Sequence, residues 1–336
     1  VCGRHVLRTA KDLFDFPINS VKDIPEIMTI SQMTASTNTV NINLFDDAIL
    51  LIEATTKFVV IKDGECETNN DVKRYPVRVG DEKLILLICY ESSLMEELYE
   101  AMCIQVEATK RSCDAFVPIK TYDVLGLPYP IAKMIRTIQS DYNKTPYFYQ
   151  LEESMFPLRT SEWDKDSVKA FVIHMCSLIK QLHNARMCFG DFNYQTLALL
   201  NPDDPESVRI ISAKNITFWV NSNGEIKSSR PGLGTVFPLT SSREVHSKNA
   251  PGRYDDFESL LYLVLTIQKK ILPWDDSTSL RDINRYKDAF LIEPGLYIQI
   301  ETMESLNSLC KMIYESDYDE RPIYTCIEDL FIRIVA

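Results

Sequence analysis

The sequence predicts an α+β fold in which a small β-rich half carrying one helix precedes a larger helical half. In residues 48–90 the apolar side chains come in short runs separated by polar turns, which is typical of β-strands. From Asp164 onward the apolar spacing changes to about 3.6 residues, the period of an α-helix. Residues 257–267 are apolar on nearly every side, as expected of a helix buried at the centre of a domain.

The first half contains five predicted strands and one predicted helix. Short apolar runs favour strands at 48–52, 58–61 and 84–89, and the pattern of 95–102 favours one short helix. Two further strand-like runs follow at 116–124 and 147–151. Together these segments predict a small sheet with a single helix.

The second half is predicted to be mainly helical. A long helix begins near residue 164, where Asp164 or Asp166 can cap its first turn. The runs 197–200 and 208–211 indicate a short β pair, whereas the polar stretch 212–252 is not expected to be regular. Amphipathic stretches near 279–291, 301–314 and 323–335 complete the helices. We therefore predict three regions, which are an N-terminal extension (1–47), a small lobe (48–153) and a large lobe (154–336).

Composition narrows the class of protein. The net charge of −12 at pH 7 argues against nonspecific binding to nucleic acid or to anionic membranes, which both require excess Lys and Arg. The nine cysteines are odd in number and scattered without metal-ligand spacing, which indicates free thiols in a reducing compartment. No apolar run approaches the roughly 20 residues of a membrane span, and no signal-peptide pattern opens the chain. An intracellular location, cytoplasmic or nuclear, is therefore expected.

Several motifs in the second half follow the order of one known family. The strongest is Gly-Arg-Tyr-Asp-Asp-Phe-Glu-Ser-Leu-Leu-Tyr at 252–262, followed by Leu-Pro-Trp at 272–274. Leu-His-Asn-Ala at 182–185, Gly-Thr-Val at 234–236 and Arg321-Pro322-x-Tyr324 occur in the same register. This set resembles the casein kinase 1 and tau-tubulin kinase family of protein kinases. The resemblance implies a bilobal protein-kinase fold with a β-rich N-lobe and an α-helical C-lobe.

Aligned on these motifs, most groups that carry phosphoryl transfer are missing. Residues 189–196 stand where the family has His-Arg-Asp-x-Lys-x-x-Asn, and only Asp191 is retained. Asn193 replaces the phosphate-contacting Lys, and Thr196 replaces the metal-binding Asn. Ser212 stands where the Asp of Asp-Phe-Gly holds Mg²⁺, and a neutral hydroxyl cannot take the place of that carboxylate.

The predicted small lobe lacks its phosphate contacts as well. Residues 52–58 take the place of the Gly-rich loop but contain no glycine, so side chains crowd the place where bare N–H groups cradle phosphate. The strand 86–89 has no Lys, and Ile88 is among the residues at the expected position of the ATP-binding Lys. Lys57 or Lys62 could reach the site from a neighbouring strand, but the glycines and the metal ligand would also need replacement.

These losses predict a pseudokinase that uses no cofactor, does not bind ATP with Mg²⁺, and acts as a protein-interaction scaffold or allosteric partner. Two alternatives stay open, namely an atypical active Ser/Thr kinase with substituted catalytic residues and a metal-independent nucleotide-binding switch. Structural roles are expected for Asp191, for Asp256 as the residue that holds its loop, and for Arg321. The protein partner is not specified by the sequence, although an apolar motif with Leu13, Phe14, Phe16 and Ile18 offers one possible interaction surface.

Overall fold

The computed structural model describes residues 48–53, 56–62, 67–69, 72–79, 82–89, 92–124, 148–211, 213, 216–219, 237–275 and 279–336. The chain divides into two compact units, each described by itself below. The first is assigned Val1–Cys103 and Val117–Met155, and the second is assigned Ile104–Phe116 and Phe156–Ala336. Unlike the predicted lobes, the second unit thus includes a short segment from the first half of the sequence.

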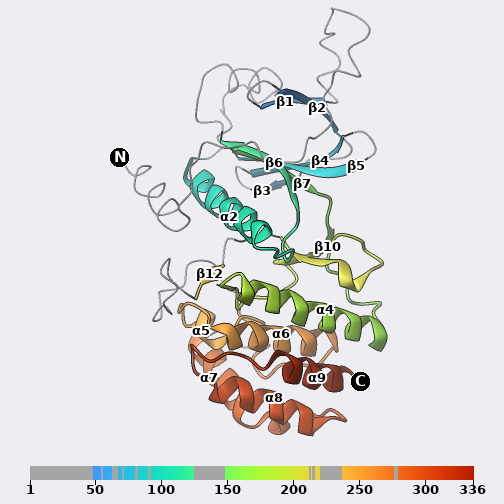
Figure 1. Ribbon diagram of the computed structural model, residues 1–336. Helices are drawn as coiled ribbons and strands as arrows, with labels where there is room; N and C mark the ends of the chain where they lie inside the picture. The colour runs from blue at the N-terminus through green and yellow to red at the C-terminus, as the bar shows by residue number, and fades with distance from the viewer. Residues whose placement is uncertain are drawn as a thin grey trace, which may run out of the picture. The chain divides into compact units, whose positions relative to one another are not determined.

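A seven-stranded antiparallel sheet and the first part of one helix form the described part of the first unit (Figure 1). Its strands run in the order β1-β2-β4-β5-β7-β6, and the short β3 pairs with β4. The strands are β1 (Ala48–Glu53), β2 (Thr56–Lys62), β3 (Glu67–Asn69), β4 (Val72–Val79), β5 (Glu82–Cys89), β6 (Ile119–Val124) and β7 (Phe148–Glu153). The predicted strands 48–52, 58–61, 84–89, 116–124 and 147–151 all overlap members of this sheet.

Strand β4 was not expected from the sequence, although it lies between β2 and β5. Its sequence, VKRYPVRV, contains Pro76, which lacks a backbone N–H and so argues against an interior strand. The charged residues Lys73, Arg74 and Arg78 also hide the apolar alternation. In the structure Pro76 lies opposite Ile85 in the β4–β5 ladder, so tertiary pairing overrides local preference here.

Helix α2 (Ser92–Lys110) is longer than the predicted helix 95–102. Its last turns belong to the second unit, where Arg111, just after the helix, donates from Nη1 to the carbonyl of Ala185, 3.1 Å away. The backbone N–H of Asp114 donates to Oε1 of Gln181 at 3.1 Å. These contacts fix the end of α2 to the C-terminal end of the long helix of the second unit.

The described part of the second unit is mostly helical (Figure 1). Its helices are α4 (Lys165–Asn184), α5 (Arg243–His246), α6 (Arg253–Ile267), α7 (Leu280–Ile292), α8 (Met303–Glu315) and α9 (Tyr324–Val335), with 3₁₀ turns η3 (Pro205–Ser207) and η4 (Pro294–Leu296). Asp164 caps α4, as one of the two predicted caps, by accepting from the N–H of Ser167 at 2.8 Å. Helix α6 is buried along nearly its whole length and contacts α4 and α8, which confirms the central helix expected from the sequence.

Short strands connect the helices at the site of interest. Strand β10 (Leu197–Leu199) pairs with β11 (Val208–Ile210), as predicted, and also with β8 (Phe156–Pro157). Strand β9 (Met187–Cys188) pairs with β12 (Thr217–Phe218). The loop of residues 189–196 therefore joins β9 to β10 and is fixed at both ends. None of the described helices is long and apolar enough to cross a membrane.

Candidate functional site

Asp256, in the first turns of α6, anchors the loop of residues 189–196. Its carboxylate is fully buried and accepts hydrogen bonds from the backbone N–H groups of Phe189, at 2.8 Å, and of Gly190. The other carboxylate oxygen lies 2.8 Å from Nε2 of His183, at the end of α4. Three buried polar groups from two elements thus converge on one side chain, which fixes the backbone of the loop before Asp191.

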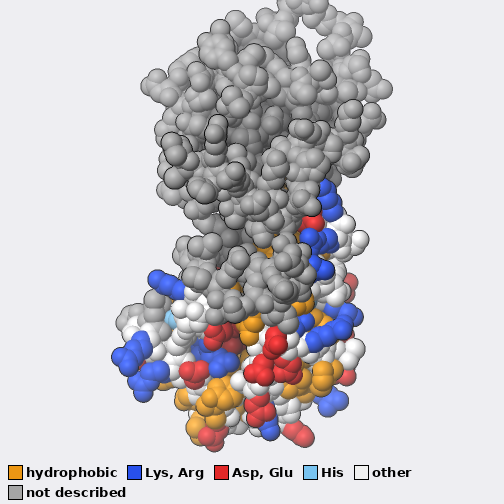
Figure 2. Space-filling model, turned by 60° about the vertical axis from the view of Figure 1, so that its left-hand side comes forward, with side chains coloured by type: hydrophobic (Ala, Val, Ile, Leu, Met, Phe, Trp, Pro, Cys, Tyr) orange, Lys and Arg blue, Asp and Glu red, His pale blue; other side chains and the backbone are white. Residues whose placement is uncertain are grey.

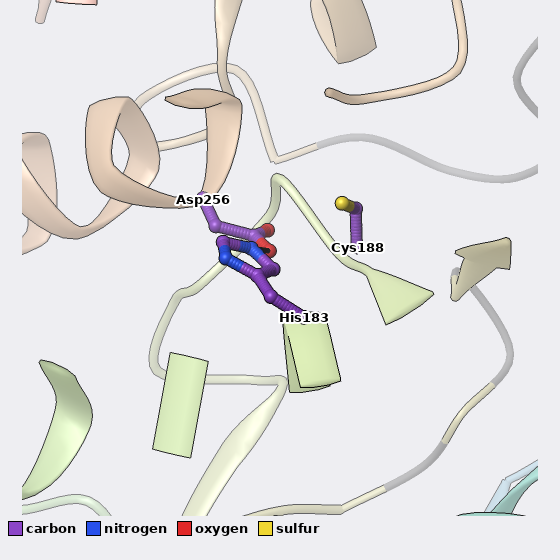
Figure 3. Close-up of side chains that lie close together, drawn as sticks. All are labelled: His183, Cys188 and Asp256. Atoms are coloured by element: carbon purple, nitrogen blue, oxygen red, sulfur yellow. Dashed lines mark hydrogen bonds and ion pairs between the residues drawn. The ribbon is translucent and has the colours of Figure 1, made fainter. Parts of the chain in front are cut away.

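His183, Cys188 and Asp256 lie close enough to one another to be considered as metal ligands. Figure 3 shows the imidazole of His183 facing the carboxylate of Asp256, with Cys188 to one side. Both ring nitrogens of His183 are already paired, Nε2 with Asp256 and Nδ1 with the Tyr324 hydroxyl at 3.0 Å. Burial raises the pKa of the Cys188 thiol well above its usual range, which opposes the thiolate form that a metal requires. The three residues therefore fit a hydrogen-bonded loop anchor better than a metal centre.

Gly190, at the family's Arg position, has a backbone that only glycine adopts easily. Its φ is +67°, in the left-handed region. A Cβ added there would lie 2.6 Å from Cγ2 of Val245 and 2.8 Å from Cβ of Pro251. No larger side chain fits unless these neighbours move, so the loop in this conformation has no room for an arginine at position 190.

The side chains of Asn193 and Thr196 are used within the loop itself. Oδ1 of Asn193 accepts from the N–H groups of Gln195, at 2.7 Å, and Thr196, at 3.1 Å. The Thr196 hydroxyl donates to the carbonyl of Asp191 at 2.9 Å. Asn193 is 1% exposed, and its amide donates to the carboxylate of Asp191 at 3.2 Å. These two predicted degenerate positions therefore stabilise the turn and offer no carboxylate or ammonium group for phosphate chemistry.

Asp191 itself is shielded from solvent, with 1% of its surface exposed. Its carboxylate accepts from Asn193 and from the backbone N–H of Phe237. Burial raises the pKa of Asp191 to about 6, against the opposing effects of these hydrogen bonds and of the positive charge of Lys287. The Asp191 carboxylate is therefore buried and bonded to groups of the protein itself.

A buried polar group on α7 that the sequence analysis missed lies near Asp191. Lys287 is fully buried and donates from Nζ to the carbonyls of Pro238, at 2.8 Å, and Ser241, at 2.5 Å. Burial lowers the pKa of Lys287 to about 7, although Glu258 and Asp191 act in the opposite direction. A sequence signal existed, because Lys287 shares the apolar face of the predicted helix 279–291 with Ile283 and Phe290.

Several predicted site residues lie outside the described part of the chain. These are Ser212, at the expected metal position, and the apolar motif with Leu13, Phe14, Phe16 and Ile18. Ile88 lies in β5, but its side chain is not among those described. Arg321 is described and lies exposed in the turn before α9, while Arg253 packs its guanidinium over the ring of Trp219, 4.2 Å from the centroid.

Comparison with known proteins shows the fold. No protein-family model and no curated protein matches the sequence. The solved structure of vaccinia related kinase 3 matches with a TM-score of 0.63, covering 89% of this chain and 92% of that chain at 16% sequence identity.

The chain has a protein-kinase fold. The bilobal α+β architecture predicted from the sequence is thereby confirmed, with the seven-stranded sheet and most of α2 in one unit and the other described helices in the second. At 16% identity the likeness extends to the fold alone and carries no statement about activity.

The sheet of this kinase fold offers a second position for the Gly-rich loop. In protein kinases the ATP-binding Lys is on the third strand, and β5 is the third strand of the meander β2-β4-β5. Counted in this way, a Gly-rich loop would fall between β2 and β4, at residues 63–71 of the sequence, and the predicted place at 52–58 stays an alternative. The stretch 63–71 contains a single glycine, Gly64. Lys83, the lysine of β5, is exposed and lies at the start of the strand, opposite Arg78.

Proposed function

We propose that this protein is a pseudokinase, a protein-kinase fold that acts by binding a protein partner and not by transferring phosphate. The observation that carries the proposal is the environment of Asp191. A catalytic base must lie within hydrogen-bonding reach of the substrate hydroxyl. Asp191 is instead 1% exposed and is occupied by Asn193 and the N–H of Phe237.

The residues present do not fit magnesium nucleotide. Phosphoryl transfer depends on Mg²⁺ ligands and on cations that neutralise the phosphates. Asn193 and Thr196 are neutral and bonded within their own loop. In the sequence, Ser212 replaces the metal-binding carboxylate, and neither candidate Gly-rich loop has the glycines of the family. We therefore infer that no step of catalysis is retained.

Thermal unfolding of the purified chain with ATP and Mg²⁺ tests this proposal. A ligand that binds only the folded state raises the melting temperature, by an amount equivalent to about 2.7 kcal/mol when its concentration is a hundred times Kd. We expect no measurable rise with millimolar ATP and MgCl₂. A rise that requires Mg²⁺, together with transfer of labelled phosphate to a substrate, would support an atypical active kinase.

The same measurement in EDTA separates the remaining alternative. A rise with ATP that persists without metal, and without phosphate transfer, would indicate a nucleotide-binding switch. An active protein kinase of the same fold serves as the positive control in both buffers.

The binding role needs its own experiment. The intact chain and a variant lacking residues 1–47 are used as bait in matched pull-downs. A partner lost on truncation assigns binding to the extension that contains Leu13, Phe14, Phe16 and Ile18. A partner retained by the truncated chain assigns binding to the folded body.

A further inference from the structure

Residues 237–242 form a segment, half-buried at 237–239 and buried at 240–242, that lies directly against the loop of Asp191. Thr240, Ser241 and Ser242 are all fully buried. The N–H of Ser242 donates to the carbonyl of Gly190 at 2.9 Å, and the N–H of Phe237 reaches the carboxylate of Asp191. The segment therefore covers the loop, and its hydroxyl groups are out of reach of a modifying enzyme unless it opens.

Side chains from outside the segment donate hydrogen bonds to its backbone carbonyl groups. Lys287 donates to Pro238 and Ser241, as described above. Trp274, in the Leu-Pro-Trp motif, donates from Nε1 to the carbonyl of Leu239 at 2.8 Å. Of these donors, Lys287 alone bonds two carbonyls, one near each end of the segment.

An ion pair fixes the residue that follows. The N–H of Arg243 donates to Oε1 of Glu258 in α6 at 2.8 Å, and its guanidinium lies 3.2 Å from Oε2. The same guanidinium contacts Asp288 in α7 at 2.9 Å. Residue 243 is thus tied to both α6 and α7.

Burial of the Lys287 ammonium group is unfavourable, and its two hydrogen bonds offset part of that cost. It is fully buried, with Nζ 5.3 Å from the ring centroid of Tyr262 and 5.6 Å from that of Trp274. An ammonium group loses its hydration there, and burial of a charged group is unfavourable unless it is paired. The charged groups that act on it are Glu258, Asp191 and Arg243.

We propose that Lys287 is a brace that holds residues 237–242 in one fixed conformation, so that this segment is ordered without phosphorylation. Kinase activation loops are commonly ordered by new contacts between arginines and a phosphorylated residue. Here the position before Asp191 is Gly190, where no arginine fits. Contacts from α7 take over the ordering and keep Asp191 covered.

Hydrogen exchange of the full chain, resolved by peptide, tests the brace. Lys287→Met is compared with Lys311→Met, which removes an exposed lysine from α8. We expect the amides of Thr240, Ser241 and Ser242 to exchange at least about tenfold faster in Lys287→Met than in the control. Peptides from α8 and α9 should keep the rates of the unmodified chain.

Two outcomes would overturn the brace. Unchanged exchange at 240–242 would show that Lys287 does not order the segment, and equal acceleration in α8 and α9 would show only loss of global stability. If Lys287→Met does not fold, Lys287→Gln is measured instead. Its amide nitrogen lies one atom short of the Nζ position, so we expect the bonds to Pro238 and Ser241 to weaken and exchange at 240–242 to rise in the same direction. Treatment of the unmodified chain with phosphatase must leave the protection intact. Because none of these readouts uses nucleotide, the brace and the pseudokinase assignment can fail separately.

Discussion

At the scale of single residues, the environment of Asp191 carries the proposal that this kinase fold is a pseudokinase. The aspartate is retained in the sequence, and sequence comparison alone is compatible with a retained base. In the structure its carboxylate is buried, and its pKa is raised to about 6. We propose that burial gives Asp191 a structural role, although its place in the sequence resembles that of a catalytic base.

This environment predicts that Asp191→Asn stabilises the protein at neutral pH. Because the folded pKa is raised from 3.8 to about 6, the unfolded state loses its proton first, and wild-type stability falls as pH rises through that interval. Each pKa unit corresponds to about 1.4 kcal/mol of free energy of unfolding. Removing the charge also weakens the hydrogen bond from the N–H of Phe237, so we expect a net gain of about 1–3 kcal/mol at pH 7.5. Chemical denaturation across pH measures the difference, which should vanish near pH 4.

The matched control is Asp203→Asn, because Asp203 is exposed in the turn before η3. It should change stability by less than about 0.5 kcal/mol at every pH tested. A loss of stability in Asp191→Asn at pH 7.5 would contradict the account of Asp191, because it would mean that the buried charge itself stabilises the fold.

At the scale of elements, helix α6 positions two neighbouring segments because its buried acidic side chains accept hydrogen bonds from their backbone N–H groups. Asp256 holds the loop of residues 189–196, and Glu258 holds Arg243. The sequence predicted this central helix from its apolar residues and predicted Asp256 as the residue that holds the loop. It did not predict the contacts of Glu258 and Lys287, because their partners lie in residues 238–243, within the polar stretch 212–252 that has no regular pattern.

Two substitutions at Asp256 should differ in cost. Asp256→Ala leaves the N–H groups of Phe189 and Gly190 and one nitrogen of His183 without a partner, and should destabilise the protein by about 3–5 kcal/mol. Asp256→Asn can keep the carbonyl facing both N–H groups and donate to Nε2 in the other His183 tautomer, so it should cost about 1–2 kcal/mol. Equilibrium denaturation in urea compares them. Equal losses would show that the anchor needs the negative charge and not merely the hydrogen bonds.

At the scale of the whole molecule, the net charge of −12 affects stability and binding. Figure 2 shows acidic and basic side chains interspersed on the visible part of the described surface, with a cluster of acidic side chains near its middle. An excess of one sign destabilises a compact chain through self-repulsion, and salt shortens the range of that repulsion to about 3 Å at 1 M.

We therefore expect the melting temperature to rise by a few degrees between about 0.01 M and 0.5 M NaCl, as screening weakens self-repulsion. Differential scanning fluorimetry measures the change. KCl should give the same curve, whereas a rise seen only with sulfate would indicate exclusion of the salt from the surface instead. A steady fall with NaCl would show that favourable surface ion pairs outweigh the net repulsion.

The sequence by itself determined most of the strands and helices and the burial of α6, because hydrophobic period is a local property. Strand β4 was not predicted, because Pro76 and three basic residues give a local pattern that argues against a strand. Pairing with β2 and β5 overrides that local preference. The tertiary structure alone decided that Asp191 is covered, that Gly190 has no room for a side chain, and that Lys287 meets residues 238 and 241. Those facts depend on contacts between segments far apart in the chain, where burial and electrostatic effects are set by the fold and cannot be read from any one segment.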